Sequence, residues 1–204
     1  DFEASTNDGV SSFKLVVVGD DDGWDVYAHE LGHLLPSNYR PFRGCGLPDL
    51  YSYRASERGV ESSRWVGPWD LMDDGQTFSA WSKIALGWLA PQEVRLAPEI
   101  SVAVSLQPLE NSLGTRAIVV PLGYETSYVI EVRRQIGYDK TLPDEGVLVY
   151  FADLSIRSGY GLLKVIDAKP ETRTFDDATF KNGETFDDNR NSVHIRVALP
   201  DNLG

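Results

Sequence analysis

The strongest constraint in the sequence is the string His-Glu-Leu-Gly-His at residues 29–33, which lies inside a segment with helical periodicity. Between residues 24 and 35, apolar side chains recur at the third or fourth position, which is the spacing of one helical face. Pro36 ends the expected helix, because the residue before a proline is driven out of the α conformation. An apolar run at 14–18 predicts a preceding strand. The first part of the chain is therefore expected to be a mixed α/β unit.

The two histidines of this string are four positions apart, so on a helix both imidazoles lie on one face and can bind the same metal ion. Glu30 is offset by one residue, which directs its carboxylate toward a water molecule in the open coordination position. Zinc lowers the pKa of such a water toward about 7, and a nearby carboxylate can then accept its proton. The alternative is a solvated helix with two chance histidines, but the chain has only three histidines in total. We therefore predict that His29 and His33 bind zinc and that Glu30 is the general base.

A catalytic zinc ion needs a third protein ligand. The remaining histidine, His194, lies far along the chain in an expected strand and is interpreted as structural. Asp49, in Gly-Leu-Pro-Asp, is the preferred oxygen ligand, and Glu57 and Glu61 are the alternatives. Cys45 as a fourth ligand would close the site to water, so this only cysteine is interpreted as a small buried residue.

Four strings in the first half resemble the immune-inhibitor-A family of secreted zinc metallopeptidases, which belongs to the metzincin type. They are HELGH at 29–33, GLPDLY at 46–51, GPWDLMDDG at 67–75 and FSAWSKIALGWL at 78–89. The resemblance implies that Asp49 is the third zinc ligand and that Met72, the only methionine, forms a methionine turn (Met-turn) beneath the metal; the alternative for Met72 is core filling. In the family, Gly-Leu-Pro-Asp begins shortly after the second histidine, whereas here the ten residues 36–45 intervene.

The composition of the chain changes near residue 90. All tryptophans, the methionine and the cysteine precede it, and short β-branched and aromatic runs separated by turn residues follow it. These runs predict an antiparallel sandwich or barrel with strands at 100–106, 117–121, 127–133, 146–151, 162–166 and 192–197. A second helix is expected at 79–89 with Ser79 as its cap, and the proline-containing stretch 89–98 is the expected hinge.

The predicted fold class is thus α+β, with a catalytic unit over residues 1–90 and a β-sandwich-like domain over residues 91–204. The resemblance implies that the catalytic unit is metzincin-like. The strings at 128–133 and 146–150 also resemble the β-rich region that follows the catalytic unit in the same family. Metzincin-type units have several strands ahead of the active-site helix, and only 28 residues precede His29. We therefore expect an N-terminal segment of the same precursor to be missing.

The chain carries 19 lysines and arginines against 31 aspartates and glutamates, a formal net charge of −12. This charge disfavours nucleic acid and anionic membranes as partners, and without an apolar run of 18 residues no membrane insertion is expected. Two aspartate clusters could bind calcium, but neither matches the twelve-residue calcium loop, so solvated turns are the preferred interpretation. The clusters are Asp20, Asp21, Asp22 and Asp25, and Asp176, Asp177, Asp187 and Asp188.

Together these features predict a secreted, zinc-dependent endopeptidase that acts on a protein or peptide substrate. The alternative is a non-catalytic, zinc-stabilised binding protein whose β-rich half is the recognition surface. The presence of Glu30 argues against this alternative, because a purely structural site has no use for a base.

Overall fold

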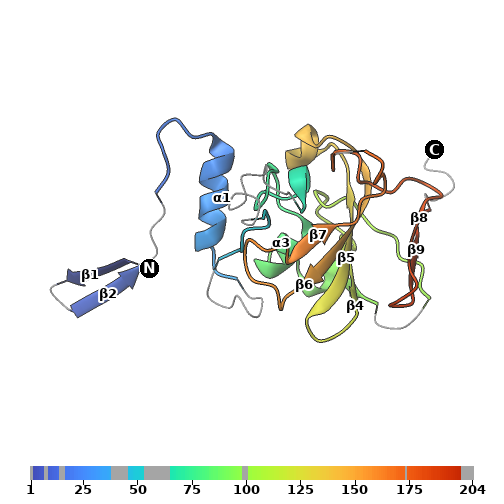
Figure 1. The fold of residues 1–204 in the computed structure, drawn as a ribbon, viewed down its shortest axis with the longest axis horizontal. Coiled ribbons are helices and arrows are strands. Elements are labelled where there is room, and N and C mark those ends of the chain that lie inside the picture. Colours follow the sequence, from blue (N-terminus) through green and yellow to red (C-terminus); the bar gives the residue numbers. More distant parts are fainter. Residues whose placement is uncertain are drawn as a thin grey trace.

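The computed structural model describes residues 2–6, 9–13, 17–37, 46–52, 65–97, 101–172 and 174–198 of the 204-residue chain (Figure 1). Within these ranges, three short 3₁₀ helices accompany the α-helices and strands. The elements in chain order are β1 (Phe2–Thr6), β2 (Gly9–Phe13), α1 (Trp24–Leu34), η1 (Gly67–Trp69), α3 (Ala80–Ala85), η2 (Pro91–Glu93), β3 (Val94–Leu96), β4 (Ala117–Pro121), β5 (Thr126–Arg133), η3 (Gly137–Thr141), β6 (Gly146–Asp153), β7 (Leu163–Val165), β8 (Thr185–Asp188) and β9 (Val193–Arg196).

The first predicted helix is confirmed as α1, which ends one residue before the expected position. Leu35 has an extended backbone, as expected for the residue before a proline. The strand predicted at 14–18 is not formed by Val17 and Val18, which belong to no regular element, and residues 14–16 lie outside the described part. Instead, β1 and β2 pair with each other as an antiparallel hairpin.

The second predicted helix, α3, is shorter than expected. Ser79 is its N-cap, and the Ser79 hydroxyl accepts a hydrogen bond from the Ser82 backbone N–H. The helix ends before Gly87, whose φ of 72° lies in the left-handed region that terminates helices. Trp88, which was expected on the buried face, is therefore outside the helix and 51% exposed.

The β-rich half is built on one open five-stranded sheet in the order β3-β4-β5-β6-β7. Its neighbouring strands are antiparallel except for β3 and β4, which are parallel. β3 lies inside the stretch expected as a hinge, and β8 was not predicted. The strand expected at 100–106 is wrong over its described part, because residues 101–106 belong to no strand.

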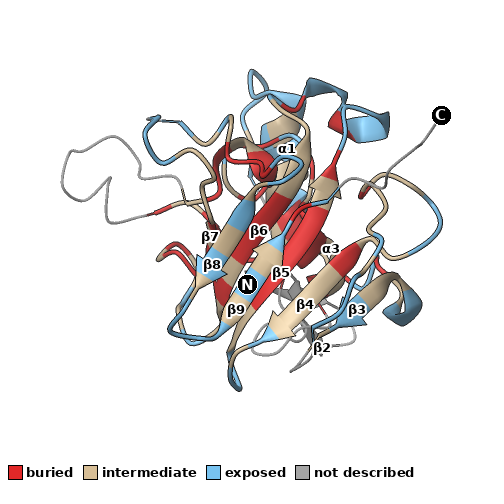
Figure 2. Cartoon of the chain, turned by 90° about the vertical axis from the view of Figure 1, so that its right-hand side faces the viewer, coloured by how far each residue is buried: buried red, intermediate tan, exposed pale blue. Residues whose placement is uncertain are grey.

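Both faces of this sheet are covered, so the central strands β5 and β6 bury side chains on both sides. The β8–β9 hairpin lies over one face, with the Phe186 ring 5.1 Å from that of Tyr128 (Figure 2). The described sheets do not close into a barrel, and the second layer is only this two-stranded hairpin. The β-rich half is thus a single open sheet with a small covering layer.

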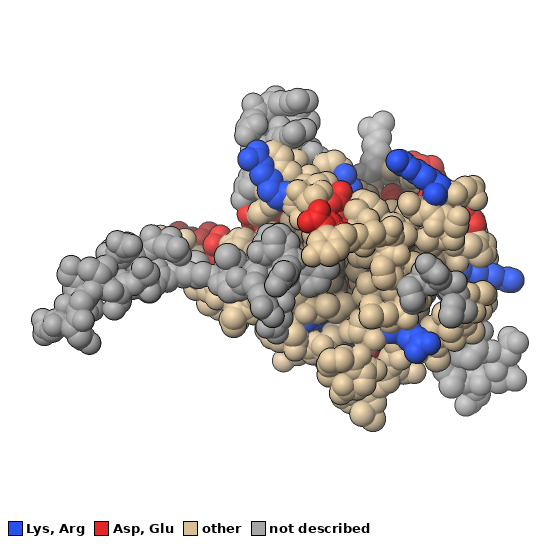
Figure 3. All heavy atoms as spheres, turned by 90° about the horizontal axis from the view of Figure 1, so that it is seen from below, with Lys and Arg blue, Asp and Glu red and all other residues tan. Residues whose placement is uncertain are grey.

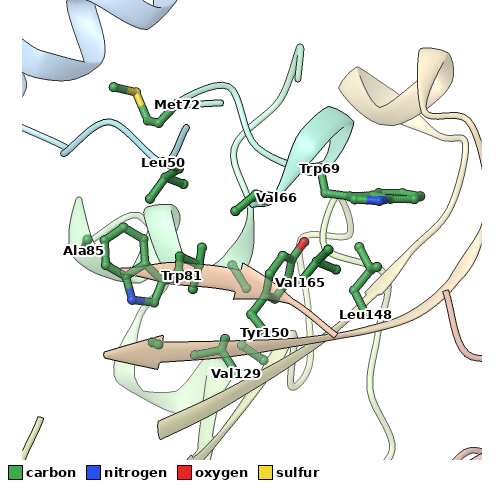
Figure 4. Close-up of a cluster of buried hydrophobic side chains, with 14 of the residues drawn as sticks. Leu50, Val66, Trp69, Met72, Trp81, Ala85, Val129, Leu148, Tyr150 and Val165 are labelled. Carbon is green, nitrogen blue, oxygen red and sulfur yellow. The ribbon is translucent and has the colours of Figure 1, made fainter. Parts of the chain in front are cut away.

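The other face of the sheet packs against the segment that precedes it in the chain. Trp69, Met72 and Trp81 belong to the same buried cluster as Leu148 and Tyr150 (Figure 4). A boundary near residue 90 stays a prediction, but this core takes side chains from both sides of that position. Leu47 and Leu50, on either side of Asp49, belong to the same cluster, so the segment that carries Asp49 is packed on the sheet.

A buried ionic network joins the sheet to the start of α3. Glu131 accepts a hydrogen bond from the Ala80 backbone N–H at 2.5 Å, and Arg133 pairs with both Glu131 and Asp139 at 3.1 and 3.0 Å. Arg133 also donates to the backbone oxygen of Phe78. Because removing one partner would leave an uncompensated buried charge, this network fixes the segment before α3 firmly on β5.

Candidate metal centre

His29 and His33 project from one face of α1, as the four-residue spacing predicted, with ring centroids 4.9 Å apart. The Nδ1 of His29 donates to the backbone oxygen of Leu71 at 2.8 Å, and the Nδ1 of His33 donates to that of Leu47 at 2.7 Å. Histidine ligands of metals usually make this second contact, which fixes the tautomer and the orientation of the ring. It leaves each Nε2 atom to face the same point.

That point is next to the carboxylate of Asp49, which is buried. Its Oδ1 atom lies 3.2 Å from the Nε2 atom of each histidine, and the three ligand atoms all lie within 4.8 Å of one another. This group could hold a metal ion. Among the described residues it is the one group of histidine, cysteine and carboxylate side chains with such geometry.

The segment that carries Asp49 is threaded between α1 and the turn around Met72. Leu47 donates from its backbone N–H to the oxygen of Gly32 at 2.8 Å, and Leu50 donates to the oxygen of Met72 at 2.8 Å. The first bond returns the chain to α1 despite the inserted residues, and the second holds it against the turn around Met72. The insertion itself falls largely on residues 38–45, outside the described residues.

Gly46 is required by this close approach. A Cβ atom at position 46 would lie 1.8 Å from the backbone oxygen of His33, so only glycine fits here without movement of the backbone. Cys45, Glu57 and Glu61, the alternative ligands, lie outside the described residues.

Met72 is fully buried beneath α1 and is not part of the ligand group. A Cβ atom at Gly32 would lie 2.6 Å from its Sδ atom, so the glycine between the two histidines makes room for the methionine. The buried carboxylate of Asp70 holds the turn, because it accepts hydrogen bonds from the backbone N–H groups of Met72 and Ser79 at 2.8 and 2.9 Å. The function of Met72 as a Met-turn stays a prediction.

Glu30 lies on α1 between the two histidines and is half-buried. Its negative charge contributes to the raised pKa of His33. Its assignment as a general base is not tested by this geometry and stays a prediction.

The pKa of both imidazoles is raised above the ordinary value of 6.5. For His29, burial has the largest effect and lowers the pKa, but the hydrogen bonds to Asp49 and Leu71 together outweigh it. For His33, the hydrogen bond to Asp49 has the largest effect and raises the pKa. Because a metal ion binds the neutral imidazole, protons compete with it at this site.

A cavity of about 570 Å³ lies beside α1, and its lining includes neither of the two histidines nor Asp49. Ala28, next to His29 on α1, and Leu71, which holds the His29 ring, are part of its wall. The aromatic side chains of Trp24, Phe78 and Trp88 line it further, and the ion pair between Lys83 and Glu110 at 2.5 Å lies at its edge. This cavity was not predicted from the sequence, because its wall combines α1 with residues up to 141.

The third histidine and the aspartate clusters lie elsewhere. His194 is exposed on β9 and pairs with Asp187, far along the chain from the ligand group. Asp188 accepts a hydrogen bond from the Tyr128 hydroxyl at 2.6 Å. In the described part of the chain, neither aspartate cluster forms a group with metal-binding geometry.

Comparisons with known protein families, with curated proteins and with solved structures found no match to this chain. In the described ranges, no helix is both long and apolar enough to cross a membrane. On the face drawn in Figure 3, the described lysine and arginine side chains are scattered rather than gathered into one continuous patch. The function must therefore be argued from the ligand group and its surroundings.

Proposed function

We propose that the chain is a secreted zinc-dependent endopeptidase whose metal is held by His29, His33 and Asp49. The observation that carries this proposal is the convergence of two imidazole Nε2 atoms and one carboxylate oxygen, with Glu30 on the same helix. Three protein ligands with one position left for water are typical of catalytic zinc, whereas structural zinc usually has four.

The donor set and two of its three ligand separations support zinc as the metal. Tetrahedral bonds of about 2.0–2.1 Å place neighbouring ligand atoms roughly 3.3 Å apart. The separation from Asp49 Oδ1 to each histidine Nε2 is 3.2 Å. Zinc is also the common metal for mixed nitrogen and oxygen ligands of this kind, whereas calcium prefers six to eight oxygen ligands.

When bound, zinc would supply a Lewis acid that acidifies a water molecule and polarises the scissile carbonyl. Glu30 then accepts a proton from the attacking water and donates it to the nitrogen of the leaving amine as the peptide bond breaks. Leu47 and Leu71 hold the two imidazoles through their backbone oxygens during these steps. The cavity lined by Ala28 and Leu71 is the candidate place for a substrate side chain.

The test is cleavage of casein by the zinc-loaded chain, with and without a chelator, for the parent and Glu30→Gln. The amide keeps the shape of the side chain but cannot accept the proton, so we expect zinc to remain bound and the rate to fall by about 10²–10⁴. Glu125→Gln, a change of the same kind in the loop before β5, is the control and should cleave like the parent.

Two results would contradict the proposal. Cleavage by Glu30→Gln at the parental rate would exclude Glu30 as the base. Zinc bound tightly by a parent chain that cleaves nothing would favour the non-catalytic binding protein instead.

A further inference from the structure

The turn between β6 and β7 contacts the metal-ligand segment from a distant part of the chain. The Ser158 hydroxyl accepts a hydrogen bond from the Asp49 backbone N–H at 2.9 Å and donates one to Asp49 Oδ2 at 3.2 Å. The Gly159 backbone N–H donates to the Asp49 backbone oxygen at 2.9 Å. Next to these contacts, Ser52 and Tyr160 form an antiparallel bridge.

These contacts engage different polar atoms of Asp49 than the two imidazoles do. The backbone N–H, the backbone oxygen and Oδ2 contact the turn, whereas Oδ1 faces the two imidazoles. Ser158 thus holds Oδ2 on the side of the turn, while Oδ1 lies 3.2 Å from the Nε2 atom of each histidine. A hydroxyl suits this position, since it can accept one hydrogen bond and donate another at the same time.

The turn itself is held firmly. Tyr160 donates from its backbone N–H to the oxygen of Arg157 at 3.2 Å, and the Arg157 guanidinium lies 3.9 Å from the centre of the Tyr160 ring. Gly159 has a φ of 72°, the left-handed value that a type II turn requires at its third position. At the base of the connection, the Asp153 N–H donates to the Leu162 oxygen at 2.7 Å, beside the paired strands β6 and β7.

We propose that Ser158 is a positioning residue of the metal centre, which orients the Asp49 carboxylate so that Oδ1 faces the metal. This inference rests on the proposed function, in which Asp49 binds the metal. It also makes the β-rich half a necessary part of the centre, because the turn that orients the third ligand belongs to the five-stranded sheet. Partners that orient a metal ligand in this way are typically worth 10- to 100-fold in metal affinity.

The experiment measures zinc affinity by competition with a chromophoric chelator for the full chain and three variants. We expect Ser158→Ala to bind zinc about 10- to 100-fold more weakly, and Ser158→Thr, which keeps the hydroxyl, to bind like the parent. Ser155→Ala is the matched control, because Ser155 lies in the same connection but is exposed and bonds to Asp153 instead. Its affinity should equal that of the parent.

Cobalt substitution separates positioning from general stability. The visible absorption of bound Co²⁺ reports the coordination of the ion, so we expect a changed spectrum in Ser158→Ala and an unchanged one in Ser155→Ala. A Ser158→Ala variant with parental affinity and a parental cobalt spectrum would overturn the proposal.

Hydrogen exchange in the parent keeps the proposal testable if Ser158→Ala does not fold. Zinc should slow exchange of the Gly159 amide, which is bonded to Asp49, and an unchanged rate would contradict the inference. The variant Asp49→Ala distinguishes the two levels of the argument. If Asp49→Ala keeps parental zinc affinity, the proposed metal centre itself is wrong, whereas loss of zinc in Asp49→Ala but not in Ser158→Ala refutes only the positioning by Ser158.

Discussion

Replacing Gly46 with alanine tests whether the close contact between the ligand segment and α1 assembles the metal centre. The added Cβ atom would lie 1.8 Å from the backbone oxygen of His33. Because ordinary contacts begin near 3.4 Å, the two backbones must separate by roughly 1.5 Å. Neither is the end of a flexible side chain, so the strain cannot be relieved by a change of rotamer.

A separation of this size breaks two hydrogen bonds. They are the bond from the Leu47 N–H to the Gly32 oxygen, 2.8 Å long, and the bond from His33 Nδ1 to the Leu47 oxygen, 2.7 Å long. At about 1 kcal/mol each, their loss lowers the free energy of unfolding by about 2 kcal/mol. For a domain of this size, that corresponds to a fall in Tm of roughly 4–8 °C. Loss of the bond to His33 should also weaken zinc binding about 10- to 100-fold.

The assay is thermal unfolding of the zinc-free chain, followed by zinc titration against a competing chelator. Gly123→Ala is the matched control, since Gly123 is exposed and its added Cβ atom would meet only the side-chain oxygen of Thr126. A Gly46→Ala variant with the Tm and zinc affinity of Gly123→Ala would refute the reasoning, because the backbones would then not approach each other as described.

Two further predictions concern the core beneath the site and its protonation. Met72→Leu should keep zinc and lower the free energy of unfolding by less than about 1.5 kcal/mol, because it is a volume-conserving change of a fully buried side chain. Chemical denaturation with and without zinc measures this effect. Loss of zinc would show that Met72 does more than pack. Stability of the zinc-free chain should fall as the pH rises from below 6.5 through the raised pKa values of His29 and His33, because a raised folded-state pKa stabilises only the protonated form. Zinc affinity should increase over the same interval as the protons leave. Burial also raises the pKa of Asp139 to about 6, so this carboxyl titrates in the same pH interval. The double variant His29→Ala/His33→Ala therefore serves as the reference in the pH titrations. If its stability shows the same pH dependence, the two histidines are not the cause of that dependence.

The local sequence was enough to predict those elements that depend on residues close together in the chain. The helix at 24–34 and its end before Pro36 follow from periodicity and proline geometry, and the four-residue spacing alone places His29 and His33 on one face. Strands β4 and β5 also lie where their apolar runs predicted.

Whether an apolar run becomes a strand depends on the strand edges that the rest of the sheet leaves for pairing. The run at 101–106 has the composition of a strand, but β4 is paired with β5 on one side and with β3 on the other. No edge of β4 is left for it. Such pairing depends on the whole sheet, so periodicity within one segment cannot predict it.

The sequence brought forward Asp49 as a candidate, but only the tertiary structure decided that its Oδ1 atom meets both imidazoles. Nothing in the sequence pointed to Ser158, which lies 109 residues from Asp49, or to the carbonyl oxygens of Leu47 and Leu71. The physical reason is that secondary structure depends on neighbours a few residues apart, whereas a metal centre depends on atoms a few ångströms apart. Those atoms come together only when distant segments pack on one core.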